Sequence, residues 1–129
     1  MKNILLVDDD EATREVLKGI LERRGYSVLG CRNYDEASKI IYDRAVVVDA
    51  AFFDQVLSMD GTKELERRYG KEENFRFEGT QLYDMFKLER PNIPCCLLSA
   101  FASLETKKNR RFMPKPLILR EINNFIENI

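Results

Sequence analysis

Residues 3–10 read NILLVDDD, a short apolar run that ends abruptly in Asp8, Asp9 and Asp10. A continuously apolar run of this length predicts a strand that is buried on both faces, as strands of parallel sheets are. Between residues 13 and 24 the apolar side chains recur with the spacing of one helical stripe, and Gly25 follows where a helix commonly ends. The chain is therefore expected to open with a strand and a helix.

The same alternation continues along the chain. Further strands are predicted at residues 26–31, 45–53, 93–98 and 112–115. Helices are predicted after the capping residue Asn33, between Gly79 and Pro91, and along a closing apolar stripe formed by Leu119, Ile122, Phe125, Ile126 and Ile129. Strands that alternate with helices at this spacing predict an α/β protein whose parallel sheet is covered on both sides.

Two charged stretches interrupt this pattern. The segment at about residues 57–78 is dense in charged side chains and has little to bury, so it is predicted to be an insertion. We interpret it as a solvated loop, with a lid or docking element as the alternative. The basic cluster Lys107, Lys108, Arg110 and Arg111 is predicted to be a solvated face, or else a contact for an acidic partner.

Length and composition narrow the classes of function. A length of 129 residues fits a single domain over 1–129, and a net charge of −1 provides no general attraction to nucleic acid or anionic lipid. The chain has no histidine, which excludes Ser-His-Asp and Cys-His catalysis, imidazole-ligated zinc and a phosphohistidine donor. Chemistry in this chain is therefore expected to use carboxylates, hydroxyls, lysine and backbone groups.

The apolar stretches and the cysteines indicate the compartment. No signal peptide or membrane-length apolar stretch is found, so we expect a cytoplasmic location, with neither a membrane nor direct nucleic-acid contact. Cys31, Cys95 and Cys96 lie in apolar segments and are odd in number, so they are predicted to be buried, reduced packing residues.

Polar side chains follow the predicted strands at the points where the strands end. In an open parallel sheet, ligands bind just beyond these carboxyl ends. The residues delivered there are Asp8, Asp9, Asp54, Ser99 and Lys115. Clustered carboxylates repel one another unless a cation lies among them, and oxygen ligands suit Mg²⁺. A lysine and a hydroxyl beside them would hold the oxygens of a phosphoryl group, so the pattern favours phosphoryl transfer to a carboxylate.

Two other aspartates need a separate interpretation. Asp49 also follows apolar residues and is the rival of Asp54, although Asp54 fits the length of the predicted strand better. Asp10 precedes a predicted helix and is expected to act as its N-terminal cap.

Four stretches resemble the receiver domains of response regulators. They are the first strand with its acidic pair (4–10), the acid five positions before Asp54 (49–54), the Ser-Ala pair after the fourth strand (97–100) and the Lys-Pro loop (113–117). The resemblance implies a flavodoxin-like, doubly wound, five-stranded parallel sheet with strand order 2-1-3-4-5. It further implies that the insertion lies between the third strand and the third helix, and that the fourth-helix region is shortened.

The resemblance also assigns roles to single residues. It makes Asp54 the phospho-acceptor and gives Mg²⁺ four ligands, namely Asp8, Asp9, Asp54 and the backbone carbonyl of Val56. It makes Ser99 and Lys115 the residues that contact the phosphoryl group, and Phe112 the aromatic residue whose rotamer differs between the two states of the switch. It also implies a cis peptide bond between Lys115 and Pro116.

The function that this resemblance implies is a phospho-acceptor switch of a two-component system. A histidine kinase or histidine phosphotransfer protein would be the donor, and a downstream protein would be the target, with homodimer formation left open. The chain would not be an enzyme beyond catalysing its own phosphorylation and dephosphorylation. The main alternative is a degenerate receiver-like interaction module that works without phosphorylation.

Two further protein classes fit the residues less well. A hydrolase of the haloacid-dehalogenase type would use the Asp8-x-Asp10 pattern, but that motif requires Thr or Val where this chain has Ala12. A flavin-binding flavodoxin relative would meet three aspartates where its phosphate needs a cradle rich in Ser, Thr and Gly.

Overall fold

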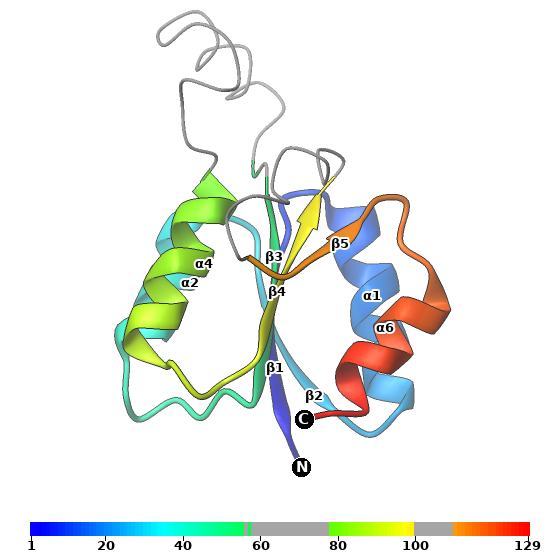
Figure 1. The fold of residues 1–129 in the computed structure, drawn as a ribbon, viewed down its shortest axis with the longest axis horizontal. Coiled ribbons are helices and arrows are strands. Elements are labelled where there is room, and N and C mark those ends of the chain that lie inside the picture. Colours follow the sequence, from blue (N-terminus) through cyan, green and yellow to red (C-terminus); the bar gives the residue numbers. More distant parts are fainter. Residues whose placement is uncertain (56, 58–77, 100–109) are drawn as a thin grey trace, which may run out of the picture.

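A five-stranded parallel sheet forms the centre of the protein (Figure 1). The computed structural model describes residues 1–55, 57, 78–99 and 110–129. The strands are β1 (Asn3–Val7), β2 (Ser27–Cys31), β3 (Ala50–Asp54), β4 (Cys95–Ser99) and β5 (Phe112–Pro114). Their order across the sheet is β2-β1-β3-β4-β5, and every pairing is parallel. The predicted flavodoxin-like sheet and its strand order are confirmed.

Helices cover both faces of this sheet. On one side lie α1 (Glu11–Arg23) and α6 (Leu119–Ile126), and on the other lie α2 (Tyr34–Tyr42) and α4 (Glu78–Glu89) (Figure 1). Parallel strands are connected by such crossovers, so the arrangement is doubly wound.

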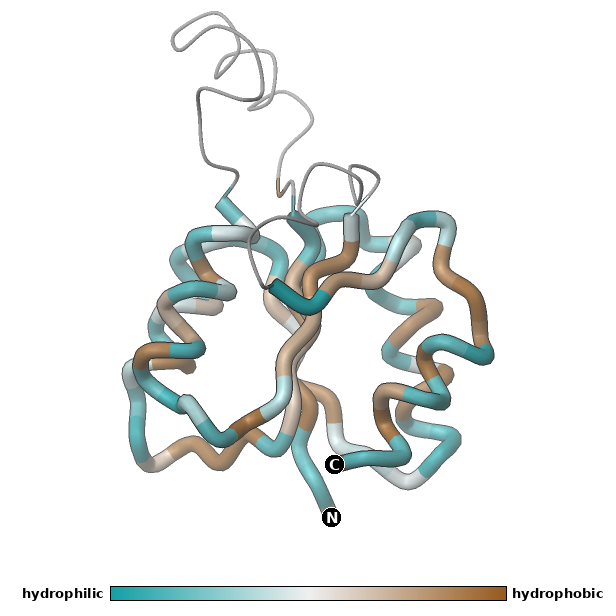
Figure 2. Tube along the Cα trace, viewed as in Figure 1, coloured by the Kyte–Doolittle hydropathy of each residue, from teal (hydrophilic) through white to brown (hydrophobic). Residues whose placement is uncertain are grey.

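Alternate residues of the strands enter two separate apolar layers. In β1, Leu5 and Val7 join the layer beneath α2 and α4, whereas Ile4 and Leu6 join the layer beneath α1 and α6. All four side chains are fully buried, as the apolar run predicted. Figure 2 shows the result, with hydrophobic residues in the central strands and hydrophilic ones on the outer sides of the helices.

Aromatic pairs fix the helices against the sheet. The ring of Phe52 lies 4.8 Å from that of Phe125 in α6, and the ring of Phe53 lies 5.6 Å from that of Phe86 in α4, measured between ring centroids. These successive residues of β3 therefore anchor one helix on each face.

The cysteines are buried and free, as predicted. Cys95 and Cys96 are neighbours in β4 and point into opposite apolar layers. Burial raises the pKa of the Cys95 thiol to about 11 and that of Cys96 to about 12, so both thiols stay protonated at neutral pH. They act as small apolar packing residues.

Helix ends follow the sequence signals. The Asn33 side chain accepts a hydrogen bond from the backbone N–H of Glu36 at 2.9 Å, which caps α2. Gly25 has a φ of 90° and ends the turn after α1. Asp10 occupies the predicted N-cap position of α1, but its carboxylate accepts a hydrogen bond from the Thr13 hydroxyl and makes no side-chain capping bond.

The third strand starts later than the sequence predicts. It was expected over 45–53 but begins at Ala50, which pairs with Ile4 of β1. Val48 is nevertheless buried and Val46 packs against the core, whereas Val47 is exposed, so only some of the apolar residues before Ala50 line the end of the core. An apolar run alone does not distinguish residues buried within a paired strand from residues buried just outside the sheet.

Several predicted features lie outside the described residues. The charged insertion does so except for Leu57 and Glu78, as does the shortened fourth-helix region within 100–109. Within the ranges that are described, no helix is long and apolar enough to cross a membrane.

Candidate functional site

The register of the sheet brings two aspartates together. Val7 of β1 pairs with Phe53 of β3, so the residues that follow, Asp8 and Asp54, are neighbours at the same sheet edge. Asp9 adds a third carboxylate, and one oxygen from each of the three groups lies within 4.8 Å of the others. The carboxyl ends of parallel strands thus form an acidic cluster, made of Asp8, Asp9 and Asp54.

Asp8 is the most enclosed member of the acidic cluster, with 0% exposure. Its Oδ1 accepts a hydrogen bond from the backbone N–H of Asp10 at 2.9 Å, and Arg14 Nη1 donates to its backbone carbonyl at 2.7 Å. Its Oδ2 is buried and accepts no hydrogen bond from the described residues. Because a buried carboxylate oxygen without a partner is costly, this atom suits direct contact with a cation.

Lys115 supplies a positive charge opposite the acidic cluster. Its Nζ donates a hydrogen bond to Asp54 Oδ1 at 2.8 Å and lies 4.0 Å from Asp8 Oδ2. The residue follows β5, where its backbone N–H donates to the Ser99 carbonyl at 2.9 Å, and its peptide bond to Pro116 is cis. The end of β5 therefore aims this side chain across the sheet edge.

Burial and charge raise the pKa of two carboxyl groups in the acidic cluster, Asp54 and Asp9. Burial raises the pKa of Asp54, the hydrogen bond from Lys115 lowers it and the Asp8 carboxylate raises it, and the net result is a pKa of about 7. Burial also raises the pKa of Asp9, and the charge of Asp8 adds to this effect. One lysine does not neutralise three carboxylates, so a divalent cation would relieve the remaining repulsion.

Ser99 lies beside the acidic cluster at the end of β4. It is 1% exposed, and its hydroxyl donates a hydrogen bond to Gln55 Oε1. Phe112 is half-buried and packs against the apolar layer beneath α2 and α4. Val56, which the resemblance makes a metal ligand, lies outside the described residues.

The other charged candidates are placed away from the acidic cluster. Asp49 lies at the opposite end of β3, where its Oδ2 accepts a hydrogen bond from the backbone N–H of Asn3 at 2.7 Å. Arg110 forms two hydrogen bonds of 2.8 Å with the Asp84 carboxylate, and the Arg111 guanidinium lies 4.6 Å from the ring centroid of Phe125. The two arginines thus have partners within the chain, whereas Lys107 and Lys108 lie outside the described residues.

Three residues near the acidic cluster were not predicted. Gln55 and Thr80 are buried polar residues whose side chains meet, with Gln55 Nε2 at 3.4 Å from Thr80 Oγ1. Gly79 lies in the first turn of α4, where a Cβ would be only 1.7 Å from the backbone oxygen of Asp54. A glycine near a helix start is a weak signal of such close approach, whereas nothing in the sequence indicates that Gln55 and Thr80 meet.

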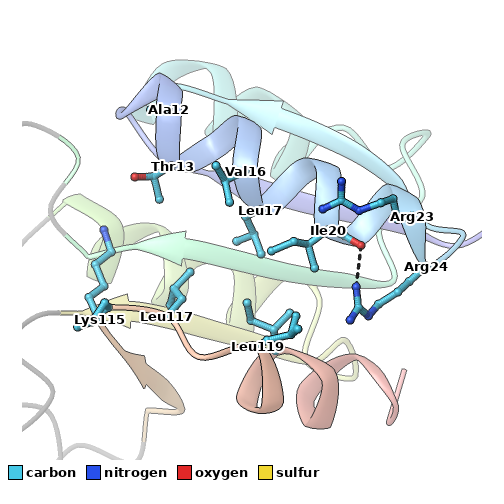
Figure 3. Close-up of a pocket in the computed structure, with 12 residues that line it drawn as sticks. Ala12, Thr13, Val16, Leu17, Ile20, Arg23, Arg24, Lys115, Leu117 and Leu119 are labelled. Atoms are coloured by element: carbon cyan, nitrogen blue, oxygen red, sulfur yellow. Dashed lines mark hydrogen bonds between the residues drawn. The ribbon is translucent and has the colours of Figure 1, made fainter.

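A groove adjoins the site on the side of α1 and α6. It has a volume of about 780 Å³ and extends from Lys115 along the two helices (Figure 3). Apolar side chains line most of it, namely Val16, Leu17, Ile20, Leu117, Leu119 and Ile122. Arg23 and Arg24 lie at its far end.

No protein-family model matches this chain. A curated relative, however, aligns with most of it. The nitrogen assimilation regulatory protein NtrX of Azorhizobium caulinodans is 30% identical over 104 residues, which cover 81% of this chain. The chain spans about a fifth of the length of that relative, 19%.

Solved structures match over nearly the whole chain. The non-phosphorylated receiver domain of HemR from Leptospira biflexa is 25% identical, with a TM-score of 0.72, covering 99% of this chain and 93% of that one. The response regulator TrrA of Thermotoga maritima, solved with Mg²⁺ and BeF, is 20% identical, with a TM-score of 0.74, covering 99% and 98%. By its fold and by these similarities, the chain belongs to the receiver domains of response regulators.

Proposed function

We propose that this receiver domain is a phospho-acceptor switch of a two-component system, in which Asp54 receives the phosphoryl group. The observation that carries the proposal is the contact of Lys115 Nζ with Asp54 Oδ1 at 2.8 Å, within a cluster of three carboxylates whose oxygens lie within 4.8 Å. A carboxylate nucleophile, further acidic ligands and an ammonium group are the parts that phosphoryl transfer to aspartate needs.

The residues of the acidic cluster fit a bound Mg²⁺. Asp8, Asp9 and Asp54 would hold it together with the Val56 carbonyl, and the buried Asp8 Oδ2 is an oxygen suited to that contact. When bound, Mg²⁺ would screen the carboxylates and the incoming phosphoryl oxygens from one another. TrrA, solved with Mg²⁺ and BeF, supports this part of the proposal.

The transfer step needs few groups from this chain. An ionised oxygen of Asp54 attacks the phosphorus, the bond from phosphorus to the donor nitrogen breaks, and an acyl phosphate forms. The nitrogen keeps the electron pair of the broken bond. Lys115 and the Ser99 hydroxyl would then hold phosphoryl oxygens, and hydrolysis of the acyl phosphate by water would reset the switch.

The donor is proposed to be a histidine kinase or a histidine phosphotransfer protein. This chain has no histidine of its own, so the phosphohistidine has to come from another protein. The apolar groove that starts at Lys115 and runs between α1 and α6 offers such a donor an adjacent docking surface. A donor seated there would present its phosphoryl group to Asp54 from solvent.

The output is proposed to pass through protein contacts. Receiver domains are signalling domains, and the only catalysis proposed for this chain is of its own phosphorylation and dephosphorylation. The downstream target, homodimer formation and the cytoplasmic location stay predictions.

Labelling from a small phosphodonor tests the proposal. With acetyl phosphate and Mg²⁺, the wild-type protein is expected to gain one phosphoryl group, and omission of Mg²⁺ is expected to abolish the gain. Asp54→Asn is expected to take no label, because its amide is not a nucleophile. The matched control is Asp10→Asn, beside the acidic cluster but not part of it, which is expected to label normally.

Intact-protein mass spectrometry measures the gain directly. Equal labelling of Asp54→Asn and wild type would refute the acceptor assignment. A folded wild-type protein that takes no phosphoryl group would instead favour the degenerate interaction module.

A further inference from the structure

A buried hydrogen bond joins two residues next to the proposed phosphoryl site. The Ser99 hydroxyl donates to Gln55 Oε1, and both residues are 1% exposed. Gln55 follows Asp54 directly at the end of β3, and Ser99 is the last residue of β4. The hydroxyl expected to contact the phosphoryl group is therefore already engaged by the side chain next to the proposed acceptor.

Gln55 is held in place from two elements. Its backbone N–H donates to the Leu98 carbonyl of β4 at 2.9 Å, and its carbonyl accepts from the backbone N–H of Gly79 in α4 at 3.0 Å. Its side-chain Nε2 lies 3.4 Å from Thr80 Oγ1. The two backbone hydrogen bonds fix the position of Gln55, and its side-chain oxygen Oε1 lies against the Ser99 hydroxyl.

The hydroxyl of Ser99 carries a single hydrogen, so it donates to one acceptor at a time. A phosphoryl oxygen is anionic and is a stronger acceptor than a neutral amide oxygen. To donate to a phosphoryl group on Asp54, the hydroxyl has to leave Gln55. That exchange breaks the buried hydrogen bond between Ser99 and Gln55, which costs free energy.

We propose that Gln55 is a positioning residue that competes with the phosphoryl group for the Ser99 hydroxyl and thereby weakens the phosphorylated state. The inference rests on the proposed function, because it concerns the same phosphoryl site. It goes further by assigning a role to a residue for which the receiver resemblance gives none.

The test is a titration of beryllofluoride, a phosphoryl mimic, at saturating Mg²⁺. Gln55→Met keeps much of the side-chain volume but removes the amide oxygen, so the unphosphorylated state loses the competing hydrogen bond. Beryllofluoride is expected to bind this variant about tenfold more tightly than wild type, the factor that corresponds to one net hydrogen bond. The affinity for Mg²⁺ alone is expected to stay unchanged, because Gln55 is not in the acidic cluster.

Two variants separate competition from a merely structural role. In a Ser99→Ala background the contested hydroxyl is absent, so adding Gln55→Met is expected to have no effect on beryllofluoride binding. Thr80→Val removes the Thr80 hydroxyl, which lies 3.4 Å from Gln55 Nε2, but leaves Oε1 in place, and it is expected to bind the mimic about as wild type does. Thermal unfolding checks that each variant is folded.

The outcomes distinguish this inference from the function on which it rests. If wild type binds the mimic but Gln55→Met does not bind it more tightly, the competition is refuted and the phospho-acceptor function stands. Tightening that persists without the Ser99 hydroxyl, or that Thr80→Val reproduces, also overturns the competition. If folded wild type binds no beryllofluoride with Mg²⁺, the proposed function fails and the inference fails with it.

Discussion

The Asp54 carboxyl group has to satisfy two opposing requirements. A nucleophilic carboxylate is ionised, yet enclosure at the end of β3 raises the pKa of Asp54 to about 7. The Lys115 ammonium group favours the ionised form, while Asp8 disfavours it. Without a metal, the ionised carboxylate of Asp54 is therefore expected to destabilise the folded protein at and above neutral pH.

Neutralising Asp54 is predicted to stabilise the metal-free protein. Its folded-state pKa lies above the ordinary value of 3.8, so the folded state binds the proton more tightly than the unfolded state. The contribution of Asp54 to the free energy of unfolding therefore falls as pH rises from about 4 to about 7 and then stays level. At pH 8, in a chelator, Asp54→Asn is expected to be more stable by at least about 1 kcal/mol, since one pKa unit corresponds to about 1.4 kcal/mol.

Chemical denaturation at pH 8 and pH 5 measures this difference. The gain from Asp54→Asn is expected to shrink at pH 5, because wild-type Asp54 is then largely protonated in the folded state. Asp49→Asn is the control at the other end of β3, where the carboxylate accepts a backbone hydrogen bond, and no gain is expected there. A less stable Asp54→Asn at pH 8 would show that the Lys115 contact outweighs burial.

Single residues differ in how far the sequence predicts their place. Asp8 and Asp54 each follow an apolar run that ends at the same sheet edge, so their meeting follows once β1 and β3 are known to be neighbours in a parallel sheet. The contacts of Gln55 with Ser99 and Thr80 depend also on where α4 begins against β3. No periodicity encodes that placement, which explains why the polar network was not predicted.

At the scale of elements, α4 begins in direct contact with the strand that carries Asp54. The backbone N–H of Gly79 donates to the Gln55 carbonyl at 3.0 Å, and a Cβ at Gly79 would lie 1.7 Å from the Asp54 carbonyl oxygen. That oxygen belongs to backbone in a paired strand, so it has little freedom to move away. The site therefore depends on the absence of a side chain at this position.

Gly79→Ala is predicted to destabilise the protein, although alanine is the better helix former. Overpacking of this kind typically costs about 1–3 kcal/mol, which exceeds the helix propensity gain of at most about 1 kcal/mol. The matched control is Gly19→Ala in α1, where the nearest atom to a Cβ is Arg23 Nη1 at 3.9 Å. That variant is expected to gain about 0.5–1 kcal/mol.

Urea unfolding of both variants gives the comparison. Opposite signs are expected for two substitutions of the same kind, both within helices. A Gly79→Ala variant as stable as Gly19→Ala would mean that α4 does not press against β3 as described.

Elements also show where the sequence misleads. The apolar residues before Ala50 were read as strand, but β1 begins only at Asn3, so the sheet has no partner for them. The end of α2 uses a partner distant in sequence, because the Arg90 guanidinium donates to the backbone carbonyls of Ile40, Ile41, Asp43 and Val46. Such a long-range cap has no local sequence signal.

At the scale of the whole molecule, the residues that pack the core and the residues of the candidate site occupy different parts of the sheet. Alternate strand residues fill two apolar layers along the length of the strands, while the polar residues gather where the strands end. The apolar runs and the helical stripes predict the layers, and the strand ends predict the cluster. Strand order came from the resemblance to receiver domains, since periodicity does not determine which strands are neighbours.

The whole arrangement implies one metal position. Carboxylates from the loop after β1 and from the end of β3 converge opposite a lysine that follows β5, and none of these elements forms the acidic site alone. Mn²⁺ takes the same oxygen ligands as Mg²⁺ and gives an anomalous X-ray signal, so it marks the position directly.

The decisive measurement is the anomalous difference map of crystals grown with Mn²⁺ and beryllofluoride. We expect one strong peak within bonding distance of Asp8, Asp9 and Asp54, with beryllofluoride density on the Asp54 carboxylate and Lys115 beside it. Crystals with fully occupied Mn²⁺ elsewhere, or with none between these three side chains, would contradict the account.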